Sequence, residues 1–121
     1  MVEKRRFPRK RADALIKVLD TMTDAVIGRV GNLSTEGMLL LADRPIVDDA
    51  LYQLRFVLPD AHGGSHTIEA GVHEHWSEEG HVPGQSWVGF RFIDISKEDA
   101  DTLSEWLVSG GEDVADAAHG G

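Results

Sequence analysis

The stretch that decides the fold is Leu51-Tyr52-Gln53-Leu54-Arg55-Phe56-Val57-Leu58. Its even-numbered residues are large and apolar, whereas the positions between them include Gln53 and Arg55. Successive side chains of a β-strand point to opposite faces of a sheet, so this alternation predicts a strand with one buried face. The same period of two recurs along most of the chain.

Further strand-like segments lie on both sides of this stretch, separated by polar turns or by turns that contain glycine and proline. They are Ala12–Val18, Ala25–Leu33, Met38–Ala42, Ile68–Trp76 and Ser86–Phe92. Six short strands at hairpin spacing favour an antiparallel sheet that closes into a barrel, because closure removes exposed strand edges.

The pattern changes at Ser96, where a short helix is expected to follow the strands. Ser96 is a suitable N-cap, and the acidic residues after it complement the helix dipole. Leu103, Trp106 and Leu107 form one apolar stripe at helical spacing, and Gly110-Gly111 ends the helix. The expected fold class is therefore all-β with a C-terminal helix, built on a six-stranded antiparallel β-barrel.

Composition divides the chain into three parts. Residues 1–11 are expected to form a flexible basic arm, in which Pro8 breaks any helix. Residues 12–109 have the length and apolar content of one barrel domain with its helix. Residues 110–121 are rich in Ala, Asp and Gly and are expected to be a disordered tail.

Several classes of protein are excluded by what the sequence lacks. Without cysteine, the chain has no disulfide, thiolate nucleophile or cysteine-ligated zinc. No apolar run approaches the length that spans a bilayer, so no membrane association is expected. The basic start is not followed by the apolar stretch of a secretory signal, which favours a cytoplasmic location.

The net charge of −9 conceals a strong asymmetry. Residues 1–11 carry six basic side chains against one acid, a balance of +5, and the remaining residues carry six basic and twenty acidic side chains, a balance of −14. Charges are screened over about 8 Å at physiological salt, so an anion near the arm responds mainly to the arm. A basic arm on an acidic body suits a small anionic ligand better than a nucleic acid polymer.

Two polar motifs could carry binding chemistry. Arg5-Arg6-Phe7-Pro8-Arg9 has the spacing R-x-x-x-R, and Asn32-Leu33-Ser34-Thr35-Glu36-Gly37 has the spacing N-x-S-x-x-G. A guanidinium donates paired hydrogen bonds to phosphate oxygens or to O6 and N7 of guanine. Asn32 and Ser34, at alternate positions of a strand end, could face a base edge from one side, and Gly37 would allow positive φ or a close approach of backbone to ligand. Taken singly, however, the first motif is compatible with a solvated tail and the second with an ordinary turn.

In their order and separation, the two motifs resemble the PilZ domain family. The family's pattern is R-x-x-x-R in an N-terminal segment followed by D/N-x-S-x-x-G, on a six-stranded antiparallel barrel with a C-terminal helix. The resemblance covers residues 5–108, and Val88-Gly89-Phe90-Arg91-Phe92 ahead of Ile95-Ser96 looks like the family's closing segment.

The resemblance implies a bacterial receptor for cyclic di-GMP that has no catalytic residue. Arg5 and Arg9 would grip phosphates and guanine edges, with Arg6 adding charge. Asn32 and Ser34 would read a guanine from the barrel surface, and Gly37 would keep the turn open. One ligand molecule and a stacked pair both remain possible.

Trp76, at the end of the fifth expected strand, has two interpretations. Its indole either stacks on a guanine outside the barrel or closes the core. His73 and His75 share a strand face, but a metal site normally needs a third ligand, so neither a metal nor a cofactor is expected.

The resulting hypothesis is a cyclic di-GMP receptor and adaptor whose arm changes conformation on binding and signals to a protein partner that the sequence does not identify. The alternative is a ligand-independent interaction module in motility or secretion. Nucleic-acid binding through the arm is a third reading, and the acidic body makes it the weakest.

Overall fold

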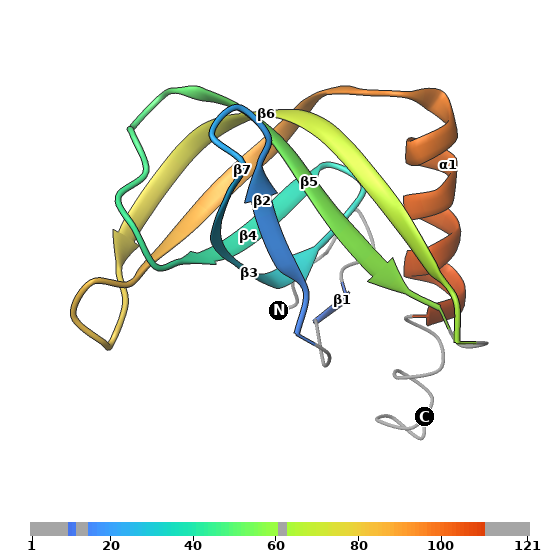
Figure 1. Ribbon diagram of the computed structural model, residues 1–121, viewed down its shortest axis with the longest axis horizontal. Helices are drawn as coiled ribbons and strands as arrows, with labels where there is room; N and C mark the ends of the chain where they lie inside the picture. Colours follow the sequence, from blue (N-terminus) through green and yellow to red (C-terminus); the bar gives the residue numbers. More distant parts are fainter. Residues whose placement is uncertain (1–9, 12–14, 61–62, 111–121) are drawn as a thin grey trace, which may run out of the picture.

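A computed structural model describes residues 10–11, 15–60 and 63–110 of the chain (Figure 1). Its strands are β1 (Lys10–Arg11), β2 (Lys17–Asp20), β3 (Ala25–Leu33), β4 (Gly37–Ala42), β5 (Leu51–Pro59), β6 (Ser65–Glu79) and β7 (Ser86–Ile95). Helix α1 (Lys97–Glu105) follows and continues into a π-helical turn, η1 (Trp106–Gly110). Within these residues, no helix has both the length and the apolarity needed to cross a bilayer.

The strands form the expected six-stranded antiparallel barrel. Their order is β3-β2-β5-β6-β7-β4, and β4 pairs back onto β3, which closes the sheet. The short strand β1 pairs antiparallel with the end of β3, beyond the segment of β3 that pairs with β2. The last two residues of the basic arm are therefore part of the sheet, whereas the sequence predicted a flexible arm that includes them.

The core fills the barrel with the inward-facing residues of every strand from β2 to β7. Leu54, Phe56 and Leu58 are fully buried, whereas Gln53 and Val57 between them are exposed, which confirms the alternation on which the fold prediction rests. Burial of such a side chain contributes roughly 1.5–3 kcal/mol relative to an exposed one. The core thus fixes which face of each strand points outward.

Two strand boundaries differ from the sequence expectation. The first barrel strand covers Lys17–Asp20 rather than 12–18, and residues 12–14 lie outside the described part of the chain. β6 runs as far as Glu79 and carries two irregularities in its pairing with β7, one of them at His75. An irregularity of this kind adds a residue to one strand and re-aims the side chains that follow it.

The C-terminal helix is confirmed and lies against β6, at the side of the barrel (Figure 1). Ser96 is its N-cap, and the Ser96 hydroxyl accepts a hydrogen bond from the Asp99 N–H at 3.0 Å. Leu103 and Leu107 are buried, and the Trp106 indole donates a 2.8 Å hydrogen bond to the carbonyl of Pro59. The helical segment ends at Gly110, and the predicted tail beyond it lies outside the described residues.

Candidate ligand-binding site

One row of paired residues crosses the sheet and joins the end of the basic arm to the second predicted motif and to Trp76. Arg11 is paired with Asn32, Asn32 with Leu39, Leu39 with Gly89, and Gly89 with Trp76. Neighbouring strands lie about 4.8 Å apart, so the row from Asn32 to Trp76 spans roughly 14 Å along the sheet. The end of the arm, the predicted turn and Trp76 therefore border one continuous surface.

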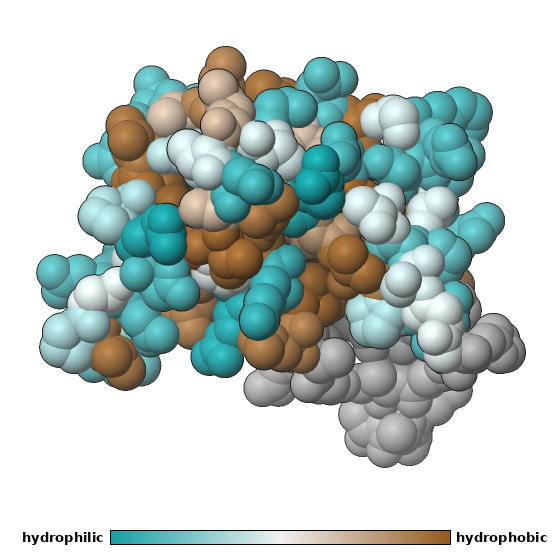
Figure 2. Space-filling view, in the orientation of Figure 1, coloured by the Kyte–Doolittle hydropathy of each residue, from teal (hydrophilic) through white to brown (hydrophobic). Residues whose placement is uncertain are grey.

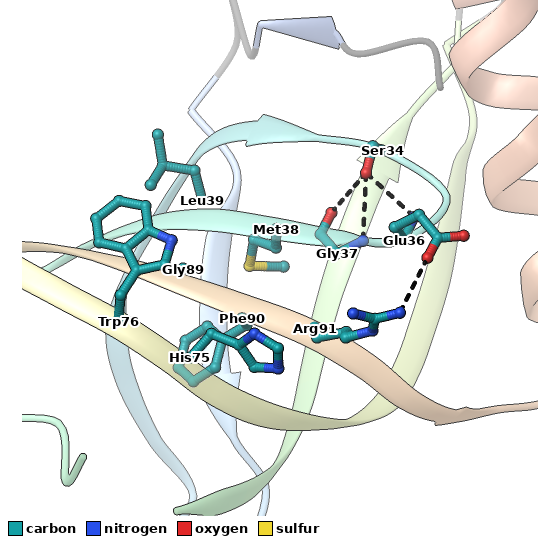
Figure 3. A pocket seen from close by; sticks show the side chains of 10 residues that line it. All are labelled: Ser34, Glu36, Gly37, Met38, Leu39, His75, Trp76, Gly89, Phe90 and Arg91. Atoms are coloured by element: carbon teal, nitrogen blue, oxygen red, sulfur yellow. Dashed lines mark hydrogen bonds and ion pairs between the residues drawn. The ribbon is translucent and has the colours of Figure 1, made fainter. Parts of the chain in front are cut away.

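A pocket of about 450 Å³ lies over the part of this row that runs from Leu39 to Trp76, and Asn32 is not among its lining residues (Figure 3). This volume is within the range of small-molecule sites in proteins. Leu39, Trp76 and Gly89 lie together at one side of it, and Ser34, Glu36 and Arg91 lie at the other. The remaining lining residues are Gly37, Met38, His75 and Phe90. The pocket thus combines an apolar aromatic part with a polar, charged part.

Ser34 organises the turn between β3 and β4. Its hydroxyl accepts hydrogen bonds from the N–H groups of Glu36 at 3.1 Å and Gly37 at 3.2 Å, and donates to the Gly37 carbonyl at 3.5 Å. Ser34 is only 3% exposed. The hydroxyl is therefore engaged with the turn's backbone, and the contact with a guanine that the sequence suggested for it stays a prediction.

Asn32 and Ser34 do not share one environment, although their spacing suggested that they would. Asn32 is half-buried within β3, whereas Ser34 is buried in the turn just beyond the last residue of β3, Leu33. Asn32 lies next to Arg11 of β1 and Leu39 of β4. Of the two residues, Asn32 is the one whose side chain has access to solvent at the row.

Gly37 allows close packing of two strands. The expected positive φ is wrong, since the glycines with positive φ in the described ranges are Gly63 and Gly84. A Cβ atom at Gly37 would collide with the carbonyl oxygen of Phe90 on β7. Gly37 therefore lets β4 lie close to β7, and the expected close approach of backbone to ligand stays a prediction. The turn is tied to β7 a second time by a 2.9 Å hydrogen bond from the Phe92 N–H to the Glu36 carbonyl.

Trp76 is on the outside of the barrel, which excludes the interpretation that it closes the core, while its stacking on a guanine stays a prediction. It is 48% exposed and lies directly over Gly89, where any Cβ atom would collide with the indole (Figure 3). The glycine on β7 thus lets the ring lie flat against the strand. An exposed, supported indole beside a pocket is suited to stacking on a planar ring.

Glu36 and Arg91 face each other at the polar side of the pocket. Their closest atoms, Arg91 Nη2 and Glu36 Oε1, are 3.8 Å apart, and both side chains are about half exposed. Such an exposed pair contributes little to stability. It does, however, place a guanidinium beside the turn in a position to meet an anion.

The sequence motifs omitted Arg91, His75 and Leu39, all of which line the pocket. A signal for Arg91 existed, because it alternates with the inward residues Val88 and Phe90 and must therefore point outward with Gly89. Which outward residues share a pocket depends on strand register, which the sequence does not supply.

The remaining predicted residues, Arg5, Arg6 and Arg9, lie outside the described part of the chain. Among the residues that are described, no three His, Cys, Asp or Glu side chains are placed to hold a metal ion. His73 instead contacts the Asp49 carboxylate at 2.6 Å, and its ring packs edge-on against His75.

Comparisons with known proteins agree with this architecture. No curated protein matches the sequence. The fold is similar to the Bacillus subtilis inhibitor of motility MotI/DgrA, with a TM-score of 0.74 and 16% identity over 93% of this chain and 53% of that one. It is also similar to the PilZ domain of Escherichia coli YcgR, solved with c-di-GMP, with a TM-score of 0.71 and 17% identity over 97% and 98% of the two chains.

Some of these similar proteins are longer than this chain. It spans 53% of the Bacillus subtilis chain and 50% of an Escherichia coli YcgR chain that was solved in complex with c-di-GMP. The PilZ domain family itself matches residues 3–109, which include both sequence motifs, the whole barrel and the helix. On that match, which agrees with the closed barrel and its C-terminal helix, the chain belongs to the PilZ domain family.

Proposed function

We propose that this protein is a receptor for cyclic di-GMP, which it binds between its basic N-terminal arm and the outer surface of β3, β4, β6 and β7. The observation that carries the proposal is the pairing of Arg11 with Asn32. It brings the end of the arm to the N-x-S-x-x-G turn, as one ligand held by both motifs requires. The solved complexes of YcgR with c-di-GMP, on the same fold, support the choice of ligand.

The geometry gives the arm's arginines enough reach. An extended chain covers at most about 3.3–3.6 Å per residue, so Arg9 lies within ~7 Å of Arg11 and Arg5 within ~21 Å, before side-chain length is added. The row from Asn32 to Trp76 spans only roughly 14 Å. Counted from Arg11, the row ends at Trp76 after about 19 Å, so Arg5 and Arg6 could contact a ligand anywhere along the row, whereas Arg9 could contact one at its Asn32 end.

The parts of the ligand suit the two sides of the pocket. A guanine stacked on the Trp76 indole would gain roughly 1–3 kcal/mol. The phosphates would be held by Arg5, Arg9 and Arg91, whose guanidinium groups can form paired hydrogen bonds with phosphate oxygens. The Asn32 amide, which both donates and accepts, would contact a base edge. Ser34 and Gly37 would act by keeping the turn in its shape.

Ligand binding would be coupled to the arm. The arm's six basic side chains repel one another, and a doubly charged anion would neutralise part of this repulsion and draw the arm onto the barrel. Ordering the arm offsets part of the contact energy, so micromolar or submicromolar affinity is expected. The changed position of the arm would then be sensed by a protein partner, which makes the molecule an adaptor.

Calorimetric titration with cyclic di-GMP tests the receptor proposal directly. We expect Arg5→Ala and Arg9→Ala each to weaken binding by about 2 kcal/mol, or roughly thirtyfold, because each removes a charge-assisted contact. Salt of ~0.15 M suppresses loose attraction to the arm, and GTP serves as the competing guanine nucleotide.

Lys97→Ala is the matched control, because it removes a cation whose partner is Asp101 on the helix, away from the pocket. An arginine variant that binds within twofold of the parent would remove that residue from the site. No heat of binding by the parent would favour a ligand-independent module instead.

A further inference from the structure

A second groove lies on the barrel between β2 and β5, on a face of its own. It has a volume of about 510 Å³ and shares no lining residue with the pocket at Trp76. Leu15, Leu19 and Val57 supply much of its apolar lining. Figure 2, in which β2 and β5 lie at the front, shows apolar surface in the middle of this face.

The groove exists because the two strands separate. The pairing of β2 with β5 ends at Val18 and Phe56, although β5 continues to Pro59. Before Lys17 the chain turns toward β3 instead, where the Ile16 carbonyl accepts a 2.9 Å hydrogen bond from the Val30 N–H. A gap therefore opens beside the last residues of β5. Leu15 is 61% and Val57 45% exposed at its edges.

The charged side chains that line the groove are basic, whereas the body is acidic. Residues 12–121 carry a net charge of −14, yet the described residues that line the groove include Lys17 and Arg55 and no Asp or Glu. Two carboxylates adjoin it and are engaged: Glu69 accepts a 2.8 Å hydrogen bond from Arg55 Nε, and Asp60 one from the Gly64 N–H at 2.9 Å. Lys17 is exposed.

We propose that this groove docks an acidic amphipathic segment of a partner protein. Apolar side chains of the segment would fill the gap between β2 and β5, and its carboxylates would meet Lys17 and the outer N–H groups of Arg55. The acidic body would attract a basic segment in general. At the groove, however, Lys17 and Arg55 would repel it. The inference rests on the adaptor part of the proposed function and not on the ligand's identity.

The groove is also well placed to respond to the arm. Leu15, at its edge, is separated from β1 by residues 12–14 alone. A ligand that draws the arm onto the row at Asn32 would therefore act on a segment that ends at the groove. The partner would read the state of the arm at a surface that the ligand does not cover.

The probe for the test is a library of short random peptides displayed on phage, selected on the full chain. We expect the enriched peptides to combine large apolar residues with Asp or Glu. By fluorescence anisotropy, Lys17→Glu should weaken binding of a selected peptide about tenfold or more, and Val57→Ser should weaken it as well. Arg44→Glu and Val82→Ser are the matched controls, being exposed residues outside the groove.

Several results would overturn the inference. One is a selection that yields no binders or only basic ones. A second is a selected peptide that Lys17→Glu leaves within twofold of its parent affinity. Another is a gain in peptide affinity of about tenfold on deletion of residues 111–121, which would make the chain's own acidic tail the occupant. The last is concentration-dependent dimerisation that Lys17→Glu abolishes, which would make the occupant a second copy. Titrating Lys17→Glu with cyclic di-GMP separates this test from the receptor proposal, because we expect the dinucleotide to bind it as it binds the parent.

Discussion

At the scale of single residues, the pocket contains one side chain that opposes its proposed ligand. The Glu36 carboxylate lies at the polar side, facing Arg91, with their closest atoms 3.8 Å apart. A phosphate bound near Arg91 would meet this negative charge and compete with it for the guanidinium. Glu36 therefore reduces affinity for any anion held by Arg91, and the same carboxylate would weaken nonspecific retention of other anions.

We expect Glu36→Gln to bind cyclic di-GMP about threefold more tightly than the parent. The amide keeps the size of the side chain and removes a charge whose repulsion at ~6 Å in water is worth roughly 0.7 kcal/mol. Calorimetry at two salt concentrations provides the measurement, because an exposed charge effect must shrink as salt rises. Glu98→Gln, which removes an exposed charge on α1, is the control. A weaker or unchanged affinity in Glu36→Gln would contradict the repulsive role.

Gly89 makes a second residue-scale prediction possible. Since a Cβ atom at this position would collide with the Trp76 indole, Gly89→Ala should displace the ring from the strand. We expect the variant to lose affinity for cyclic di-GMP by roughly 1–3 kcal/mol, as Trp76→Ala should, because both remove the stacking surface. The double variant should lose no more than Trp76→Ala alone, and an additive loss would show that Gly89 acts on something other than the indole.

At the scale of elements, the turn between β3 and β4 depends on Ser34. Its hydroxyl makes three hydrogen bonds within a turn where it is almost wholly buried. We expect Ser34→Ala to lower the free energy of unfolding by about 1–3 kcal/mol, because two backbone N–H groups lose their acceptor. Chemical denaturation measures this loss, and Ser104→Ala on the exposed face of α1 should change it by less than about 0.5 kcal/mol. Equal stability of the two variants would contradict a structural role for Ser34.

The elements also show what the sequence could and could not predict. The strand alternation at 51–58 and the Ser96 cap were predictable, because each depends on residues close together in the chain, and the barrel was predicted from the number and spacing of such strands. β1 was not, since two basic residues carry no alternation and their pairing is decided by the end of β3. The burial of Ser34 was missed because Ser34 lies beyond the last residue of β3, where strand alternation no longer applies and its hydroxyl accepts hydrogen bonds from the turn backbone.

The candidate site was predictable in its motifs and not in its geometry. Arg11 at the end of the arm, Asn32 of the second motif and Trp76 lie along one row, whereas the R-x-x-x-R motif itself lies outside the described residues. Arg91 and Glu36 are 55 positions apart in sequence and come together only through the β4–β7 register, in which Gly37 is paired with Arg91. Contacts of this kind depend on closure of the whole barrel, and no local pattern of residues reveals them.

At the scale of the whole molecule, ligand binding should stabilise the barrel and close the arm in one event. A ligand that binds the folded state alone adds RT ln(1 + [L]/Kd) to the free energy of unfolding, which is about 2.7 kcal/mol at one hundred times Kd. The sign is positive, because the row from Asn32 to Trp76 exists only when β3, β4, β7 and β6 are assembled. We therefore expect the melting temperature to rise with the concentration of cyclic di-GMP. Trypsin cleavage within residues 1–11 should slow over the same range of concentrations. Trypsin cleaves after Lys and Arg, and six of the protein's twelve such residues lie in the arm. In Arg9→Ala both effects should shift together to about thirtyfold higher concentrations of cyclic di-GMP. A rise in melting temperature without protection of the arm would mean that the barrel binds the dinucleotide without the arm. The adaptor mechanism, in which the arm carries the signal, would then fail.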